Sequence, residues 1–569
     1  MLATEDDSPG SETTIALREP TLSLQDPVDA QQHLCNAISR LTKDAQDDVT
    51  RLRALLVFEK SGHHIVQRLL ARYVEGDAQL RLLERKYWQA VVRLNRAFSK
   101  IYEQLLPPFG TISLKSGKDL VATALVHLFH HRQVEFLLRF LRYKKRNSGL
   151  WRELNATYAL AQDQGLTTLS VTLGQIEGTE RRATTLERQY LRILLLDWLN
   201  DGQLSPREAV WASTWTRRWC RELTLQSSPS ECANGAAPKG FVLDLGGSAG
   251  LVRSSAEPAG NLLYLDPTPL LSIFEEQIAA LRETRQQTRA AVQDRHNEQV
   301  ALLKRLRILM APSSIRIERR GDRRPVALPT QAVVGLAAIL RVSRWALRAG
   351  AESNPGASIV PEGDTIEAFS GLTRRGHLGG VGGADRELGT VVGDVAAEPQ
   401  IWQVKDRSES GCRMRGQPGD LNRVIPGSLI AIRADQSAPW TVTVVRRIRR
   451  LMVDHVDIGV EYLGRKPRFV KILTECADSS DTQVRDGAGR YFGALYLPAS
   501  EEYPTIPLKT LLLPAREFEA GSTLILLSSN ATYKLRLNEP LERQHGFVWT
   551  SFTLIDRQPA EMGSTTLRP

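Results

Sequence analysis

The chain has 569 residues and a mass of 63.4 kDa, which is too much for a single hydrophobic core and predicts about three or four structural units. Its 42% hydrophobic and 24% charged residues match a soluble globular protein, and no window holds the ~20 apolar residues of a membrane-spanning helix. The composition therefore excludes a chain that is disordered throughout and a transmembrane protein.

The positive charge is concentrated in one part of the chain. The formal net charge is +10, and residues 301–475 alone hold 28 Lys and Arg against 18 Asp and Glu. The rest of the chain is neutral in sum, so an anionic ligand is expected between residues 301 and 475.

The cysteines and the N-terminus indicate the compartment. The five cysteines are odd in number, lie far apart and include no C-x-x-C pair, so neither a disulfide framework nor a zinc site is predicted. The N-terminal stretch MLATEDDSPGSETT carries acids where a secretory signal has basic and apolar residues. We therefore expect a cytoplasmic protein.

Residues 1–30 are acidic and rich in Ser, Thr and Pro, and are predicted to form a flexible tail. From residue 31 to 226 apolar residues recur at three- and four-residue spacing, as at Val134, Leu137 and Leu141, which is typical of amphipathic helices. This region predicts an all-α domain of several antiparallel helices, and we expect it to dock a protein partner.

Three histidines of the helical region, His127, His130 and His131, have the spacing of one helical face. Such a group could ligate a metal. Zinc takes three or four ligands, however, and no carboxylate or thiol motif lies nearby in the sequence, so no metal site is predicted.

Residues 240–310 are predicted to form a small strand pair and long connecting helices. The segments Gly240–Gly250 and Leu262–Asp266 read as a strand, a glycine-rich loop and a second strand, similar to the cofactor site of S-adenosylmethionine-dependent methyltransferases. Only Leu251–Asn261 separate the two strands, whereas a βαβ unit takes about 30 residues or more. A hairpin is therefore favoured, and the methyltransferase is kept as an alternative.

The remaining sequence is β-like. Short alternating runs such as Leu429–Arg433, Trp440–Val445 and Val456–Leu463 predict an antiparallel barrel over residues 311–475, with an insertion at about 336–400. Residues 476–569 predict a second small β domain. The expected fold class is α+β multidomain, with an N-terminal all-α domain followed by two β domains.

Two motifs of the basic region carry chemistry. Arg316–Arg324 contains R-x-x-x-R in three overlapping registers, and Asp406–Gly411 reads D-x-S-x-x-G. Arginines can fork onto phosphate oxygens and stack on bases, whereas a carboxylate and a hydroxyl can pair with the polar edge of a purine. A glycine lets backbone approach a ligand closely.

In this order, and followed by the strands Trp440–Val445 and Ile458–Val460, the motifs resemble the PilZ-domain family over about 150 of the 569 residues. PilZ domains are six-stranded barrels that bind the bacterial second messenger cyclic di-GMP. The resemblance implies that four arginines clamp phosphates and stack on guanine, and that three further residues line the guanine pocket: Arg319, Arg320, Arg323, Arg324, Asp406, Ser408 and Gly411. The long spacing between the two motifs is attributed to the insertion.

The resemblance implies a cyclic di-GMP receptor that controls surface attachment, type IV pili, motility or biofilm formation through protein partners. No G-x-S-x-G, P-loop or H-E-x-x-H motif is present, and we expect no enzyme, no cofactor and no metal. Two further alternatives are a PilZ-like scaffold that has lost its ligand and a nucleic-acid-binding barrel. The second is disfavoured because aromatic residues at strand spacing are few.

Overall fold

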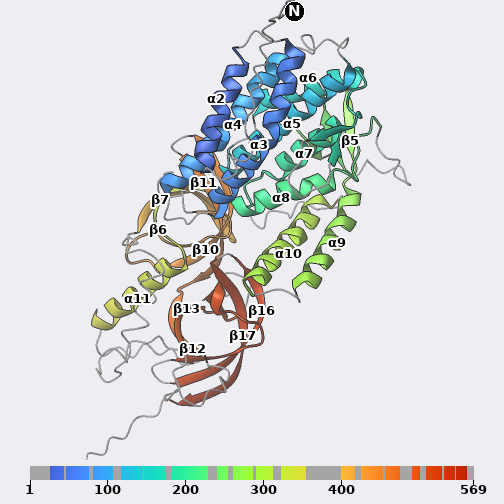
Figure 1. The fold of residues 1–569 in the computed structure, drawn as a ribbon. Coiled ribbons are helices and arrows are strands. Elements are labelled where there is room, and N and C mark those ends of the chain that lie inside the picture. The colour runs from blue at the N-terminus through green and yellow to red at the C-terminus, as the bar shows by residue number, and fades with distance from the viewer. Residues whose placement is uncertain are drawn as a thin grey trace, which may run out of the picture. The chain divides into compact units, whose positions relative to one another are not determined.

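The computed structural model describes residues 26–43, 47–75, 81–106, 117–144, 147–173, 182–228, 240–253, 261–285, 290–311, 322–353, 399–416, 424–452, 455–474, 490–499, 508–527, 531–544 and 546–559 (Figure 1). They fold into two compact units. The first draws on Met1–Arg139, Asn147–Trp198 and Ala212–Asp266, and the second on Phe140–Arg146, Leu199–Trp211 and Pro267–Pro569.

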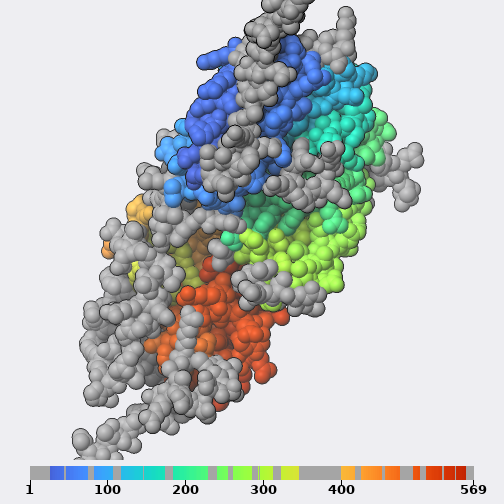
Figure 2. All heavy atoms as spheres, in the orientation of Figure 1, coloured from blue at the N-terminus to red at the C-terminus, as the bar shows by residue number. Residues whose placement is uncertain are grey.

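Helices dominate the first unit. Aromatic side chains such as Phe98, Tyr102 and Trp151 are fully buried among aliphatic residues, because each helix turns its apolar face inward. The space-filling view shows atoms of neighbouring helices in contact on the face that it presents (Figure 2). The helices are α2 (Pro27–Leu41), α3 (Asp48–Glu75), α4 (Arg81–Leu105), α5 (Lys118–Leu141), α6 (Ser148–Asp163), α7 (Leu186–Leu199) and α8 (Pro206–Trp219), the last of which begins in the second unit.

Two small sheets complete the first unit. β1 (Val171–Leu173) pairs with β2 (Arg182–Thr184), and β3 (Phe241–Asp244) lies between β4 (Val252–Arg253) and β5 (Leu262–Leu265). β3 and β5 are antiparallel, so these two strands do not form the βαβ unit of a doubly wound nucleotide fold.

A single amide holds the glycine-rich turn after β3. The Asn155 side chain donates to the carbonyls of Asp244, Gly247 and Ala249 at 3.1–3.2 Å, and it accepts from the Tyr190 hydroxyl at 2.6 Å. The turn is therefore held by a side chain of the helical packing.

The second unit contains a helical pair and two barrels. α9 (Thr268–Arg285) and α10 (Ala290–Met310) precede the barrels, and each barrel is a closed ring of six antiparallel strands. The first consists of β6 (Arg324–Val334), β7 (Gln400–Arg407), β8 (Gly411–Gly416), β9 (Leu429–Arg433), β10 (Thr441–Met452) and β11 (His455–Arg465). The second consists of β12 (Arg468–Thr474), β13 (Arg490–Leu497), β14 (Thr510–Pro514), β15 (Thr523–Leu527), β16 (Ala531–Arg543) and β17 (Phe547–Pro559), with the 3₁₀ helix η3 (Ala515–Glu517) after β14.

The fold-class prediction is confirmed: helices come first and two β-barrels follow. The second barrel begins with β12 at Arg468. Residues 468–474, which are predicted as part of the first β domain, therefore belong to the second. Of the predicted insertion, α11 (Leu336–Ser353) is described, and residues 354–398 lie outside the described part of the chain.

The two barrels share one topology. With the strands of each barrel numbered in chain order, the ring of the first reads 1-2-3-6-5-4, and the ring of the second reads the same. They also share a hydrophobic core, in which Val442 and Val444 of the first barrel pack with Leu495, Leu512 and Phe547 of the second. Only Lys466 and Pro467 separate β11 from β12, so the barrels form one continuous body.

None of the described helices is long and apolar enough to cross a bilayer.

Candidate functional site

The two sequence motifs meet at one end of the first barrel. β6 and β7 are antiparallel, with Arg324 opposite Arg407 and Pro325 opposite Asp406. The start of β6 and the end of β7 are therefore neighbours, although 83 residues separate Arg323 from Asp406. The length of the insertion does not disturb this pairing.

Asp406 lies between two arginines. Arg323 Nη1 is 3.0 Å from its Oδ1, and Arg413 Nε is 2.8 Å from its Oδ2. The carboxylate side chain is only 12% exposed, whereas both arginine side chains are 46% exposed. One buried negative charge thus holds two accessible positive charges, which leaves a net positive site at the surface.

Arg413 is the site residue that the sequence analysis missed. It lies on β8, directly across from Asp406 of β7, and residues that face each other on neighbouring strands interact. In the sequence, Arg413 is an arginine that follows the D-x-S-x-x-G motif. Its position opposite Asp406 can be recognised only once the register of β7 and β8 is known.

Ser408 and Gly411 form the turn between β7 and β8. The Ser408 amide donates to the Gly411 carbonyl at 2.8 Å, and the Ser408 hydroxyl is 3.1 Å from the same oxygen. A Cβ on Gly411 would lie 2.0 Å from the Val460 carbonyl oxygen, so the packing of β8 on β11 itself requires glycine here. The motif therefore shapes this turn and places Asp406 beside it.

The remaining arginines of the motif are placed unequally. Arg324 is exposed at the first position of β6, and the Arg407 guanidinium carbon lies 5.8 Å from the centre of the Tyr462 ring. Arg319 and Arg320 lie outside the described residues. The structure thus brings Arg323 to Asp406, places Arg324 opposite Arg407, and leaves the choice among the R-x-x-x-R registers open.

Cys412 lies directly beside this cluster. Burial raises the pKa of its thiol to about 11, so the thiolate is not populated at neutral pH. Its side chain belongs to the core of the first barrel, where it contributes packing.

Two chain segments that lie between helices are hydrogen-bonded to the part of β10 that extends beyond its pairing with β9. The Ile448 amide donates to the Gly202 carbonyl at 2.9 Å, and the Arg450 amide donates to the Tyr143 carbonyl at 3.0 Å. Tyr143 also packs against the core of the first barrel, as Val326 of β6 does. Val326, two residues after Arg324, and the segment between α5 and α6 thus contact the same core.

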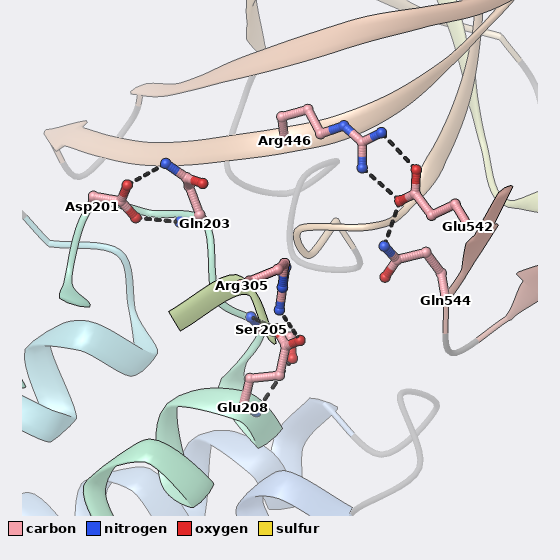
Figure 3. A network of polar contacts seen from close by, with 8 residues as sticks. All are labelled: Asp201, Gln203, Ser205, Glu208, Arg305, Arg446, Glu542 and Gln544. Carbon is pink, nitrogen blue, oxygen red and sulfur yellow. Dashed lines mark hydrogen bonds and ion pairs between the residues drawn. The ribbon is translucent and has the colours of Figure 1, made fainter. Parts of the chain in front are cut away.

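A polar network joins the first barrel to the second (Figure 3). Arg446 of β10 donates to both carboxylate oxygens of Glu542 on β16 at 2.5 and 2.6 Å, and to Glu461 at 2.6 Å. Burial opposes both charges, but the Arg446 guanidinium holds the pKa of Glu542 below its ordinary value. The Gln544 side-chain amide also donates to Glu542, so both carboxylate oxygens of Glu542 accept hydrogen bonds.

The same view shows how the chain enters α8 (Figure 3). The Ser205 amide donates to the Glu208 carboxylate at 2.8 Å, and the Glu208 amide is 3.3 Å from the Ser205 hydroxyl, which is a capping box. Arg305 of α10 pairs with Glu208 as well. The start of α8 is thereby fixed to α10 within the second unit.

The histidines of the first unit surround a buried acid. Glu59 accepts from the Tyr102 hydroxyl at 2.9 Å and contacts His131 Nε2 at 2.8 Å and His127 Nδ1 at 3.4 Å. Burial opposes its ionisation, but His131 and His127 bring the pKa of Glu59 well below its ordinary value. Within the part of the chain that the structure describes, no group of three His, Cys, Asp or Glu side chains could hold a metal ion.

One family model matches the chain. Residues 17–230 match the model described as the N-terminal domain of the cyclic-di-GMP receptor FimW. The matched region is therefore similar to part of a cyclic di-GMP receptor, and it ends before the barrels begin. No match was found among curated proteins or among solved structures.

Proposed function

We propose that this protein is a cyclic di-GMP receptor that binds the nucleotide at the Asp406 end of the first barrel. The observation that carries the proposal is the convergence of Asp406, Arg323 and Arg413, which joins two distant motifs into one cationic site. The match of residues 17–230 to a domain of a cyclic di-GMP receptor supports the ligand from an independent part of the chain. The PilZ resemblance supports the location on the barrel.

In this proposal the arginines exchange partners when the ligand binds. Phosphate oxygens take the exposed donors of Arg323 and Arg324, and bidentate contacts favour arginine over lysine here. Asp406, released in part from Arg323, accepts from the N–H groups of the guanine edge. The Ser408 hydroxyl, which now lies against the Gly411 carbonyl, is within the same turn and would donate to the base.

The proposed response to ligand binding starts at residues that pack against the core of the first barrel. Ordering of the start of β6 would move Val326, which shares its core with Tyr143. Tyr143 and the Gly202 segment connect helices of the N-terminal part, so a change there would be transmitted along the chain to those helices. We propose that a protein partner of the helical region reads this change and controls pili, motility, attachment or biofilm formation, without catalysis by this chain.

A titration of cyclic di-GMP into the full chain by isothermal calorimetry tests the proposal. The matched variants are the triple substitution Asp406→Ala, Arg320→Ala, Arg324→Ala and the single substitution Arg468→Ala. Arg468 begins the second barrel opposite Tyr496, where the first barrel places Arg324 opposite Arg407, and no carboxylate stands at this pair.

Saturable micromolar or tighter binding is expected for the wild type and Arg468→Ala, and none for the triple variant. A folded wild-type chain that gives no heat and no thermal shift would contradict the proposed receptor function. It would favour the alternative of a PilZ-like scaffold that has lost its ligand. That alternative has one observation in its favour, since Asp406 is already satisfied by two arginines.

A further inference from the structure

The outer face of α4 is positively charged. Between Glu84 and Glu103 this helix contains no acidic residue. Four of its basic residues are exposed and follow one another at spacings of seven, three and four residues, which places them on one side of the helix: Lys86, Arg93, Arg96 and Lys100. This row, the α4 basic stripe, is about 21 Å long at 1.5 Å per residue.

The charge of the α4 basic stripe is not neutralised within the described part of the chain. None of its four side chains forms a hydrogen bond or an ion pair with another described residue. Glu103 follows the stripe and is paired with Arg132 of α5 at 3.0 Å, and Arg132 also contacts Glu135 and Glu153. These acids are therefore held by another cation, and the stripe keeps its positive charge.

α2 runs beside the α4 basic stripe and in the same direction. Both α2 and α3 pack on α4 (Figure 1). Burial raises the pKa of the Asp26 carboxyl, but neighbouring hydrogen bonds and charges, Lys86 among them, bring it below its ordinary value. Nine residues later, burial raises the pKa of the Cys35 thiol, and the Arg93 charge opposes that rise. Asp26 thus lies at the Lys86 end, and α2 follows the stripe toward Lys100.

The chain that precedes α2 has the opposite charge. Residues 1–25 lie outside the described residues, and their sequence contains five acids against a single arginine, Arg18: Glu5, Asp6, Asp7, Glu12 and Glu19. Asp26, where this segment joins the described chain, already contacts a cation, because Arg72 Nη1 of α3 is 2.9 Å from its Oδ2. Seven residues separate Glu19 from Asp26, about 23 Å of extended chain, so the acids can reach every cation of the stripe.

We propose that the acidic N-terminal segment, residues 5–19, docks on the α4 basic stripe of the same chain. Surface ion pairs are weak one by one, but tethering supplies the acids at a high effective concentration, so several pairs can form together. The attraction is screened by salt, so docking weakens as the ionic strength rises. An acidic surface of another protein could reach α4 only by displacing this segment. The inference is independent of cyclic di-GMP.

Zero-length cross-linking of the full chain with a carbodiimide tests this docking, because the reagent joins a carboxylate to a lysine amine that it touches. Mass spectrometry then identifies the joined residues. Lys86 and Lys100 are the amines of the stripe, and Lys43 is the control amine, since it is exposed after α2 much as Lys100 is exposed near the end of α4. Equal mixing of ¹⁵N-labelled and unlabelled chains separates links within one chain from links between copies.

Two double variants carry the same change of net charge. Arg93→Glu with Arg96→Glu reverses the middle of the stripe, whereas Arg53→Glu with Arg152→Glu reverses two exposed arginines of α3 and α6. A melting temperature for each variant shows that it is folded. The measurement is repeated at high salt.

We expect links from residues 5–19 to Lys86 and Lys100 to exceed those to Lys43 by about fivefold or more, and to fall by a similar factor at high salt and in the stripe variant. The control variant should cross-link as the wild type does. Links that are absent, shared evenly with Lys43, or equally frequent in the stripe variant would overturn the proposal. Links mainly between labelled and unlabelled chains would overturn it as well, because the occupant would then belong to a second copy.

Discussion

The ion pairs around Asp406 place one largely buried carboxylate between two arginines. Arg413 and Arg323 both contact this carboxylate, while the neighbouring Arg415 pairs bidentately with Asp457, with distances of 2.7 and 3.1 Å. Two adjacent outward arginines of β8 thus have different partners. Only Arg413 is linked to the motif.

We predict that Arg413→Ala lowers the affinity for cyclic di-GMP by about tenfold, because Asp406 loses a positioning contact and the ligand loses a cation. Arg415→Ala is the matched control on the same strand and should change the affinity by less than about threefold, since its partner is Asp457. Calorimetry on both variants decides this. Equal losses would indicate a general effect of charge.

The buried histidines predict how stability depends on pH. Burial lowers the pKa of His63 from 6.5 to about 4, and burial also brings the pKa of His130 well below its ordinary value. Between pH 6.5 and about 4 the unfolded chain therefore binds protons that the folded chain does not, so stability is lost as the pH falls. The depressed pKa of Glu59 acts in the same direction at lower pH.

We predict a loss of roughly 3 kcal/mol from His63 alone between pH 7 and pH 4. Chemical denaturation across this range is the measurement, with His63→Gln as the comparison. The variant should show a shallower decline below pH 6.5. Parallel curves for the two proteins would mean that His63 is not the titrating group.

At the scale of elements, the edge of β10 depends on a glycine turn. Gly202 has a φ of +87°, and a Cβ there would lie 2.1 Å from the Ile448 carbonyl oxygen. Gly165, after α6, has a φ of +69° but open space around it. Both glycines have a positive φ, but only at Gly202 would a Cβ clash with β10.

We predict that Gly202→Ala lowers the free energy of unfolding by more than Gly165→Ala, which should cost only about 1–2 kcal/mol of left-handed strain. The difference isolates the close approach of the Gly202 turn to β10. Thermal or urea melts of both variants provide the comparison. Equal costs would show that the contact with Ile448 adds nothing.

The link between the barrels is a second element-scale feature. Arg446 is 40% exposed and Glu542 is 17% exposed, so water screens the pair in part. We predict that Arg446→Ala costs about 1–3 kcal/mol, below the ~3–5 kcal/mol of a fully buried pair, because Glu542 loses its counter-charge. Adding Glu542→Leu should recover much of this loss in denaturant melts. A double variant as unstable as the single one would show that apolar packing alone cannot replace the pair.

At the scale of the whole molecule, local sequence patterns predict the order of the domains, whereas the pairing of distant strands requires the structure. Helical spacing and alternating strands are local patterns, so the order of an all-α region and two β domains could be predicted. The common ring order of the barrels could not, because strand pairing is non-local and Arg468–Thr474 follows Arg465 almost without a break. For the same reason the motif predicts Asp406, whereas Arg413 can be recognised only with the register of β7 and β8.

The repeated topology also separates the roles of the two barrels. At the pair where the first barrel has Pro325 opposite Asp406, the second has Phe469 opposite Leu495. An apolar pair cannot hold a guanine edge or gather arginines. The second barrel therefore contributes its share of the common core and the Arg446–Glu542 link, and we expect the nucleotide on the first barrel alone.

The location of the ligand decides the proposal, because the family match lies in residues 17–230 and the proposed site lies beyond them. Hydrogen exchange of the full chain with and without cyclic di-GMP tests it most directly. We predict that protection rises in peptides that cover residues 322–330 and 403–413. Protection confined to α3, α4 and α5, with the barrel peptides unchanged, would contradict this prediction and place the nucleotide in the helical domain.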